Sequence, residues 1–218
     1  MKLYIFLILI FFVLEGCTRS DNFRIRALAP IQEESGKDDL ISTEQSNGSV
    51  SSTDFRTVGR GYSIVYRGLS VGMTQLNTDR STRNMSGQEV LLDEYFSTQA
   101  SYNELGLMLG EDFTFTFGVG GLVAGSGELR LDYGSSLGGT TETLMTTKPS
   151  GNSAFLTFGY DFQPVEILLG WRWNNFKASY NSLGSTLELL QNSGSLSYPT
   201  KSFSRQTSHI TAGLGASF

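Results

Sequence analysis

The stretch Ser153–Asn174, with the sequence SAFLTFGYDFQPVEILLGWRWN, decides the fold of this chain. Apolar and mostly polar positions alternate on both sides of Gln163-Pro164, and a period of two is typical of β-strands with one apolar and one polar face. The apolar positions are Ala154, Leu156, Phe158, Tyr160 and Phe162 before the turn, and Val165, Ile167, Leu169, Trp171 and Trp173 after it. Two such strands joined by two residues predict a tight β-hairpin.

The same alternation recurs on both sides of two other short joints. One joint is Arg67-Gly68, where the apolar positions change from even to odd numbers, and the other is Gly110–Asp112. The change of parity at Arg67-Gly68 predicts a tight turn, although a bulge within one long strand would give the same pattern. A last alternating stretch runs from Ile210 to Phe218.

Three mostly polar stretches, Asn77–Glu94, Gly125–Asn152 and Asn175–Arg205, separate these hairpins, and we expect them to be long loops. Short turns that alternate with long loops are typical of transmembrane β-barrels, whose outward face is apolar and whose inward face is polar. Three short turns predict eight strands, of which seven are evident. The first strand then comes from Phe23–Ala29 or from the stretch before Phe55, and a bulge at Arg67-Gly68 would leave six. We predict an all-β, antiparallel, up-and-down transmembrane barrel with eight strands.

The composition of the 218-residue chain agrees with this class. Hydrophobic residues make up 39% of it, and 25 glycines stand against 4 prolines. A barrel needs apolar residues only at alternate positions, and proline would interrupt its hydrogen-bond ladder. The net charge of −5 and the absence of a basic cluster argue against a nucleic-acid partner.

The N-terminal stretch predicts export. Met1-Lys2 is followed by the apolar run Leu3–Leu14, which has the length of a secretory signal core, so we expect residues 1–16 to be a signal peptide. Leu14-Glu15-Gly16-Cys17 resembles the lipobox of bacterial lipoproteins, and this resemblance implies that Cys17, the only cysteine, is acylated. The alternative is plain cleavage nearby, which would leave a free thiol. Residues 17–54 are polar and predict a flexible tether, which leaves residues 55–218 for the barrel.

The chain ends in an amphipathic stretch that closes on Phe218. A terminal phenylalanine in such a strand resembles the signature by which the bacterial barrel-assembly machinery recognises its substrates. Residues 55–218 as a whole resemble the small OmpA/OmpX-type outer-membrane barrels in hairpin pattern and loop asymmetry. The resemblance implies a monomer in the bacterial outer membrane, in contact with its lipid. Proteins of this type include adhesion proteins, envelope tethers and a lipid-modifying enzyme, so that fold alone does not determine activity.

Five polar residues fall on the inward faces of the predicted strands: Glu104, Asp161, Glu166, Arg172 and His209. We expect them to form an interior polar cluster, because eight strands enclose a space that side chains just fill. Glu166 and Arg172 lie too far apart along one strand to pair, so each needs a partner on another strand. The alternative is a catalytic role for His209 with a carboxylate. One histidine and one cysteine provide no metal-ligand pattern, and we expect no catalytic residue, metal or cofactor.

These features predict a non-enzymatic outer-membrane barrel with a structural or adhesion-like role, whose external loops contact an extracellular or host-surface ligand. Three alternatives remain: a lipid-anchored, lipocalin-like barrel that binds a small apolar ligand, a narrow pore, and a lipid-modifying barrel enzyme. The lipocalin-like barrel would direct the apolar positions inward, so that the direction of Phe113, Phe117 and Trp171 distinguishes it from the transmembrane barrel.

Overall fold

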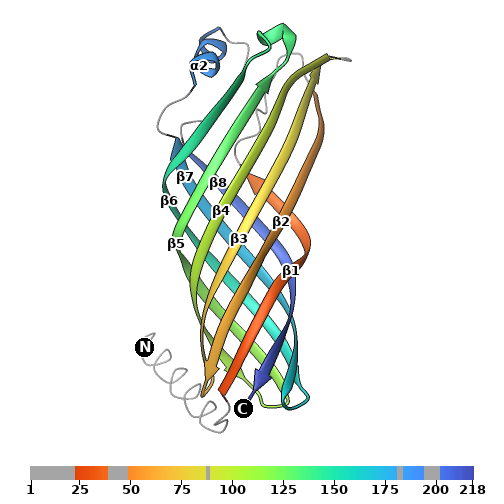
Figure 1. Ribbon diagram of the computed structural model, residues 1–218, viewed down its shortest axis with the longest axis vertical. Coiled ribbons are helices and arrows are strands. Elements are labelled where there is room, and N and C mark those ends of the chain that lie inside the picture. The colour runs from red at the N-terminus through yellow and green to blue at the C-terminus, as the bar shows by residue number, and fades with distance from the viewer. Residues whose placement is uncertain (1–22, 39–48, 87–88, 181–183, 194–201) are drawn as a thin grey trace, which may run out of the picture.

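The chain forms a closed, antiparallel, eight-stranded barrel in the computed structural model, which describes residues 23–38, 49–86, 89–180, 184–193 and 202–218 (Figure 1). Each strand pairs with its neighbours in sequence, and β1 also pairs with β8. The strands are β1 Phe23–Asp38, β2 Ser49–Tyr66, β3 Leu69–Ser86, β4 Glu89–Leu109, β5 Phe113–Tyr133, β6 Thr141–Asp161, β7 Val165–Tyr180 and β8 Ser202–Ser217. A short 3-10 helix, η2 (Ser135–Leu137), joins β5 to β6, and α2 (Ser185–Asn192) lies between β7 and β8. Among the described residues, no helix is long and apolar enough to cross a membrane.

All three predicted short turns are present at one end of the barrel, which also holds the C-terminus (Figure 1). Arg67 and Gly68 both have positive φ, of 48° and 78°, as in the two-residue turns that match the twist of a hairpin. The alternative of a bulge at this position is therefore excluded, and eight strands are confirmed. Phe23 and Phe218 exchange backbone hydrogen bonds of 3.3 and 2.9 Å, which join the first strand to the last.

The predicted boundary between tether and barrel at residue 55 is wrong, whereas Phe23–Ala29, one of the two candidates for the first strand, does lie in the first strand. The first strand begins at Phe23 and pairs with β8 from Arg24 to Asp38, so residues 23–38 and 49–54 belong to the wall and not to a tether. The pattern of β1 is weak because its outward face carries the small residues Ala27 and Ala29, while its inward face carries arginines. The predicted signal peptide and the predicted acylation site, Cys17, lie outside the described residues.

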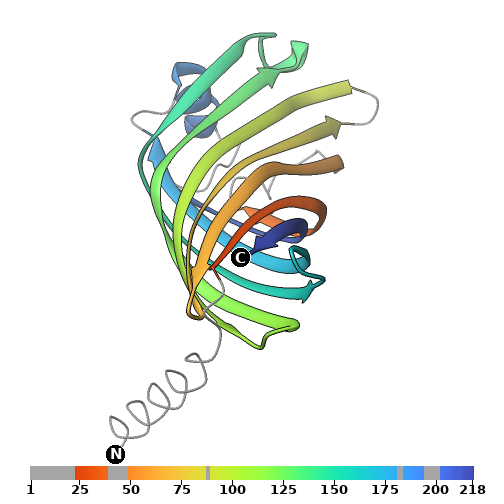
Figure 2. The same ribbon diagram turned by 60° about the horizontal axis from the view of Figure 1, so that its bottom comes forward.

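The predicted long loops are also wrong, because strands continue through most of them. β4, β5 and β6 each have 21 residues, about twice the 9 to 11 that a tilted strand needs to cross a bilayer. The upper parts of β2–β6 extend well beyond the end of the barrel that the other strands reach (Figures 1 and 2).

The lower part of the barrel, next to the short turns, carries an apolar belt on its outward face. On β5, Phe113 is 75% exposed and Val119 66% exposed. Other exposed belt residues are Ile25, Tyr62, Ile64, Tyr66, Leu69, Val71, Met73, Leu105, Leu109, Phe158, Tyr160, Val165, Ile167, Leu169, Trp171 and Leu214. Because these positions point outward, the lipocalin-like alternative is wrong for this part of the barrel.

Above the belt, most apolar side chains point inward and most polar side chains point outward. We call this part of the barrel the upper wall. Many of its inward side chains form the hydrophobic core, which comprises Leu76, Leu92, Phe96, Ala100, Tyr102, Leu129, Leu131, Tyr133, Leu144, Phe176, Ala178, Tyr180 and Leu187. The buried ion pair Arg80–Glu94 and the buried Arg205 also point inward here. Its outward positions on β3–β5 are polar or charged, and include Asp79, Ser97, Glu128 and Arg130. The upper wall is therefore built like a water-soluble β-protein, with its apolar side chains inside.

Candidate functional site

A network of buried charges fills the lower interior of the barrel. Arg26 on β1 contacts Glu166 on β7 twice, with Nε to Oε2 at 2.7 Å and Nη2 to Oε1 at 2.5 Å. Arg24 lies 2.7 Å from Asp161 and 3.1 Å from Glu166. The hydroxyl of Thr114 donates to Glu166, and that of Thr116 accepts from Arg26. All four charged side chains are at least 92% buried, so their charges are neutralised by one another and not by water.

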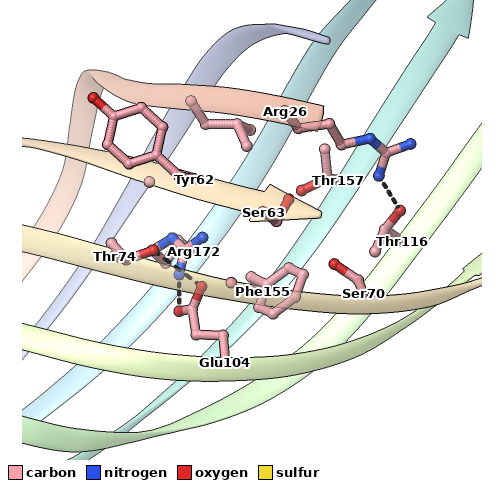
Figure 3. Close-up of a pocket in the computed structure, with 13 residues that line it drawn as sticks. Arg26, Tyr62, Ser63, Ser70, Thr74, Glu104, Thr116, Phe155, Thr157 and Arg172 are labelled. Carbon is pink, nitrogen blue, oxygen red and sulfur yellow. Dashed lines mark hydrogen bonds and ion pairs between the residues drawn. The ribbon is translucent and has the colours of Figure 1, made fainter. Parts of the chain in front are cut away.

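A second charged layer, formed by Arg172 and Glu104, lies near Arg26 in the barrel interior (Figure 3). Arg172 of β7 pairs with Glu104 of β4, and Glu104 also accepts hydrogen bonds from Thr74 at 3.0 Å and Ser153 at 2.9 Å. The Arg172 guanidinium lies over the ring of Phe155, 5.2 Å from its centroid. Together the two layers hold three arginines and three carboxylates, so the charges of these six groups balance.

His209 lies on the inward face of β8, opposite Arg172 in the strand register. It is fully buried, and neither ring nitrogen has a hydrogen-bond partner among the protein atoms. Asn174, diagonally across from it on β7, is also buried without a partner for its amide. Buried polar groups of this kind are commonly satisfied by ordered water. His209 is therefore enclosed in the barrel interior, opposite Arg172 in the strand register.

The structure places Glu104, Asp161, Glu166, Arg172 and His209 inside the barrel, where four of them join the charged layers and His209 has no hydrogen-bond partner among the protein atoms. As expected, Glu166 and Arg172 do not pair with each other, and each has its partner on another strand. Sequence reasoning missed the partners Arg24 and Arg26, which fall in the stretch predicted to be a tether. The alternation of Phe23, Arg24, Ile25, Arg26 and Ala27 was the available signal.

The charged layers act as a plug. The cavity among Arg26, Gly61, Glu104, Phe155 and Arg172 measures about 20 Å³, which is room for about one water molecule. Within the described parts of the chain, no three His, Cys, Asp or Glu residues come together as a metal site would require. This cavity is too small to hold a substrate.

The helix α2 is attached to the upper wall by Glu142 of β6. The Glu142 carboxylate accepts hydrogen bonds from the backbone N–H groups of Thr186 at 2.7 Å and Leu187 at 3.0 Å, and from the Tyr133 hydroxyl at 3.1 Å. Burial acts to raise the pKa of Glu142, but these hydrogen bonds outweigh it and hold the pKa below its ordinary value. Burial, together with the Glu142 charge, raises the pKa of Tyr133. The attachment places Leu187 fully within the hydrophobic core.

The outward face of the upper wall is the second candidate site. A hollow of about 340 Å³ on strands β2–β5 is lined by Arg56, Asp79, Tyr95, Glu128 and Arg130, with Ser81 and Ser97. Arg130 is occupied, because it pairs with Asp132 at 2.9 Å and lies over the Tyr95 ring. In the described part of the molecule, Arg56, Asp79 and Glu128 make no ion pair. This face therefore has charged side chains of both signs that form no ion pair within the described part of the wall.

The comparisons with known proteins concern architecture alone. No protein-family model matches the chain, and no curated protein matches its sequence. One similar solved structure is the outer membrane protein OprG from Pseudomonas aeruginosa, with 15% identity, coverage of 91% of this chain and 96% of that chain, and a TM-score of 0.43. The outer membrane protease OmpT from Escherichia coli has 11% identity, 92% and 98% coverage, and a TM-score of 0.49. Ail, the attachment invasion locus protein of Yersinia pestis, has 11% identity, 90% and 97% coverage, and a TM-score of 0.41.

Proposed function

We propose that this protein is a non-enzymatic outer-membrane β-barrel that presents its upper wall to molecules outside the cell. The apolar belt supports the membrane location. It is continuous around all eight strands, aromatic residues occur near its edges, and each strand crosses it in about ten residues, as a bilayer requires. A water-soluble barrel would place these side chains inside, where this chain has arginines and carboxylates.

The position of the turns supports the orientation. Outer-membrane barrels have short turns on the periplasmic side and longer segments on the outer side. Here the short turns and the C-terminus lie at one end, and the upper wall extends from the other (Figure 1). The upper wall then projects beyond the outer leaflet.

The proposed function rests mainly on a set of charged side chains that lie on a rigid surface and form no ion pair within the described chain. Arg56, Asp79 and Glu128 lie in one cross-strand row with Ser97 on the outward face. The hydrophobic core behind them holds this face in place, so a partner meets a pre-formed surface and loses less entropy on binding. A non-enzymatic role is supported by the filled interior and by the burial of His209.

The first experiment tests the location and orientation. Ser97→Cys on the upper wall and Glu111→Cys in a short turn are produced in bacteria that have an outer membrane, with the unaltered chain as the Cys17 background. A membrane-impermeant maleimide should label the Ser97→Cys protein in intact cells and the Glu111→Cys protein only after lysis. Equal labelling of both in intact cells, or recovery of the chain in a carbonate-soluble fraction, would refute the proposal.

The second experiment tests the surface role. Adhesion of producing cells to plastic coated with serum protein is compared between the native chain and the Asp79→Asn/Glu128→Gln variant. The matched control, Glu111→Gln/Asp112→Asn, neutralises two exposed carboxylates at the periplasmic turn. We expect adhesion to change for the first pair and not for the control. The proposal would be wrong if cells with the native chain, cells with either variant and cells without the protein all adhered equally.

A further inference from the structure

The barrel wall is open between β1 and β2 above the belt. These two strands pair only from Phe23↔Tyr66 to Leu28↔Gly61, whereas β2 continues to pair with β3 as far as Ser49↔Met85. The upper part of β1 remains paired with β8 and parts from β2 (Figures 1 and 2). From Ser49 to Arg60, therefore, one backbone edge of β2 pairs with no described strand.

The opening begins where the belt ends. Tyr62 is the last belt residue of β2, and the final pair with β1 is at Gly61. Unpaired backbone groups are not tolerated in hydrocarbon but are solvated in water, so a closed ladder through the belt and an open edge above it agree with a membrane surface at this level.

Two of the features that usually prevent an edge strand from pairing with other chains are absent from the β2 edge. Edge strands are commonly protected by proline, by charged side chains, by bulges or by being short. Strand β1 has Pro30, and its pairing with β8 has two register shifts, at Pro30/Gln32 and at Glu33/Ser35. The unpaired part of β2 spans twelve residues without proline, and the pairing of β2 with β3 has one register shift, at Val50/Ser52, next to the upper end.

We propose that this edge binds an extended acidic peptide segment of an extracellular partner, which adds a strand to β2. Main-chain hydrogen bonds would supply affinity, and alternate side chains would supply selectivity. Arg56 and Arg60 point outward from β2, are exposed, and form no ion pair within the described chain. They lie four residues apart, with Val58 between them, so an added strand with acidic residues at the same spacing places each carboxylate opposite one guanidinium.

The same charges argue against a second copy of this chain as the occupant. Two β2 edges paired with each other would bring Arg56 and Arg60 of one copy next to those of the other, and like charges at opposite positions are destabilising. The inward positions of this segment include Thr57 and Gly59, which are half-buried and small. They leave room for β-branched side chains on the inward face of the added strand. The expected sequence therefore alternates acidic or polar residues with valine or isoleucine.

The proposal rests on the proposed function only for the extracellular position of the edge. Binding is measured on purified protein in nanodiscs, so its failure and the failure of the outer-membrane location give different results. The probe is a nine-residue peptide, Thr-Val-Glu-Val-Thr-Val-Glu-Val-Thr. One control peptide has lysine in place of glutamate, and the other is N-methylated at alternate residues so that one edge cannot form hydrogen bonds.

Only the unmodified glutamate peptide should bind, and Arg56→Glu/Arg60→Glu should weaken its binding by about tenfold or more. The matched variant Lys148→Glu/Lys177→Glu reverses two exposed lysines on β6 and β7, away from the edge, and should bind as the native protein does. Equal binding of the lysine or the N-methylated peptide would overturn the proposal. So would unchanged binding to the arginine variant.

Hydrogen exchange tests the edge itself. Because alternate N–H groups of a strand point to opposite edges, about half of the amides between Ser49 and Arg60 should exchange rapidly in the free protein and become protected with the peptide. If all of these amides are already protected in monomeric protein, the edge is covered and the proposal is wrong. Protection that depends on protein concentration, with dimers seen by mass photometry, would assign the edge to a second copy instead.

Discussion

Arg26 and Glu166 form a two-contact ion pair across the lumen, with β8 lying between their strands in the wall. Both side chains are at least 98% buried, and Glu166 also contacts Arg24. Glu166 is thus the shared counter-ion of two arginines on β1. The pair fixes the first strand to the seventh from inside, in addition to the hydrogen bonds through β8.

Replacing Glu166 should therefore destabilise the barrel strongly. Glu166→Gln keeps the shape but leaves Arg26 without a charge partner, and the free energy of unfolding should fall by about 3 to 5 kcal/mol. Urea unfolding in detergent, followed by tryptophan fluorescence, measures this loss. Asp93→Asn is the control, because it breaks the exposed pair with Arg83 and should lower the stability by about 1 kcal/mol or less. Similar losses in the two variants would mean that the lumen is hydrated.

The second charged layer can be tested by a double-mutant cycle. Glu104→Gln and Arg172→Met each leave one buried charge unpaired, whereas the double variant leaves none at this pair. The double variant should be more stable than the sum of the single losses predicts, by about 2 kcal/mol. Additive losses would show that the two groups do not interact in the folded barrel.

The exchange of faces along β5 gives a prediction that depends on depth. Val119 and Glu128 both point outward, the first in the belt and the second in the upper wall. Val119→Arg should lower the stability of the protein in lipid vesicles by about 2 to 4 kcal/mol, because the cation enters hydrocarbon. Glu128→Arg should change it by about 0.5 kcal/mol or less. Equal effects at the two positions would place the membrane elsewhere.

The change of the apolar side chains from the outward to the inward face also explains which parts of the fold the sequence predicts. The hairpins around Arg67-Gly68, Gly110–Asp112 and Gln163-Pro164 were predicted correctly, because their apolar side chains keep one parity throughout the belt. On β4 the apolar set changes from odd positions, such as Leu105 and Leu107, to even positions, such as Phe96 and Leu92. The continuous apolar face ends at that change, so the sequence alone predicts loops where the upper strands lie.

The interior charges were predicted only in part for a related reason. Parity along recognised strands located Glu104, Glu166 and Arg172. Arg24 and Arg26 lie on a strand whose outward alanines give little hydrophobic signal, and its pairing with β8 spans nearly the whole sequence. Their role depends on the closure of the barrel between β1 and β8, and a local sequence pattern does not predict this long-range pairing.

The attachment of α2 should depend on pH. The pKa of Glu142 is below its ordinary value of 4.5, so its hydrogen bonds stabilise the attached helix above about pH 4.5 and are lost as the pH falls through the folded-state pKa. The amides of Thr186 and Leu187 should lose their protection from hydrogen exchange over this range. Glu142→Gln should reduce the protection at neutral pH, because an uncharged side chain interacts less favourably with a helix N-terminus. Protection that stays constant from pH 7 to pH 3 in the native chain would contradict this account.

The two tryptophans of the chain allow a direct test of whether the apolar belt faces lipid. Trp171 and Trp173 both lie on the outward face of β7 in the belt, so the intrinsic tryptophan fluorescence comes from this surface alone. The protein is folded into vesicles whose acyl chains carry bromine, a contact quencher. We predict blue-shifted emission that the brominated lipid quenches strongly and that iodide in the aqueous phase leaves unchanged. Emission that iodide quenches and brominated lipid does not would show that the belt faces water, and the membrane assignment would be wrong.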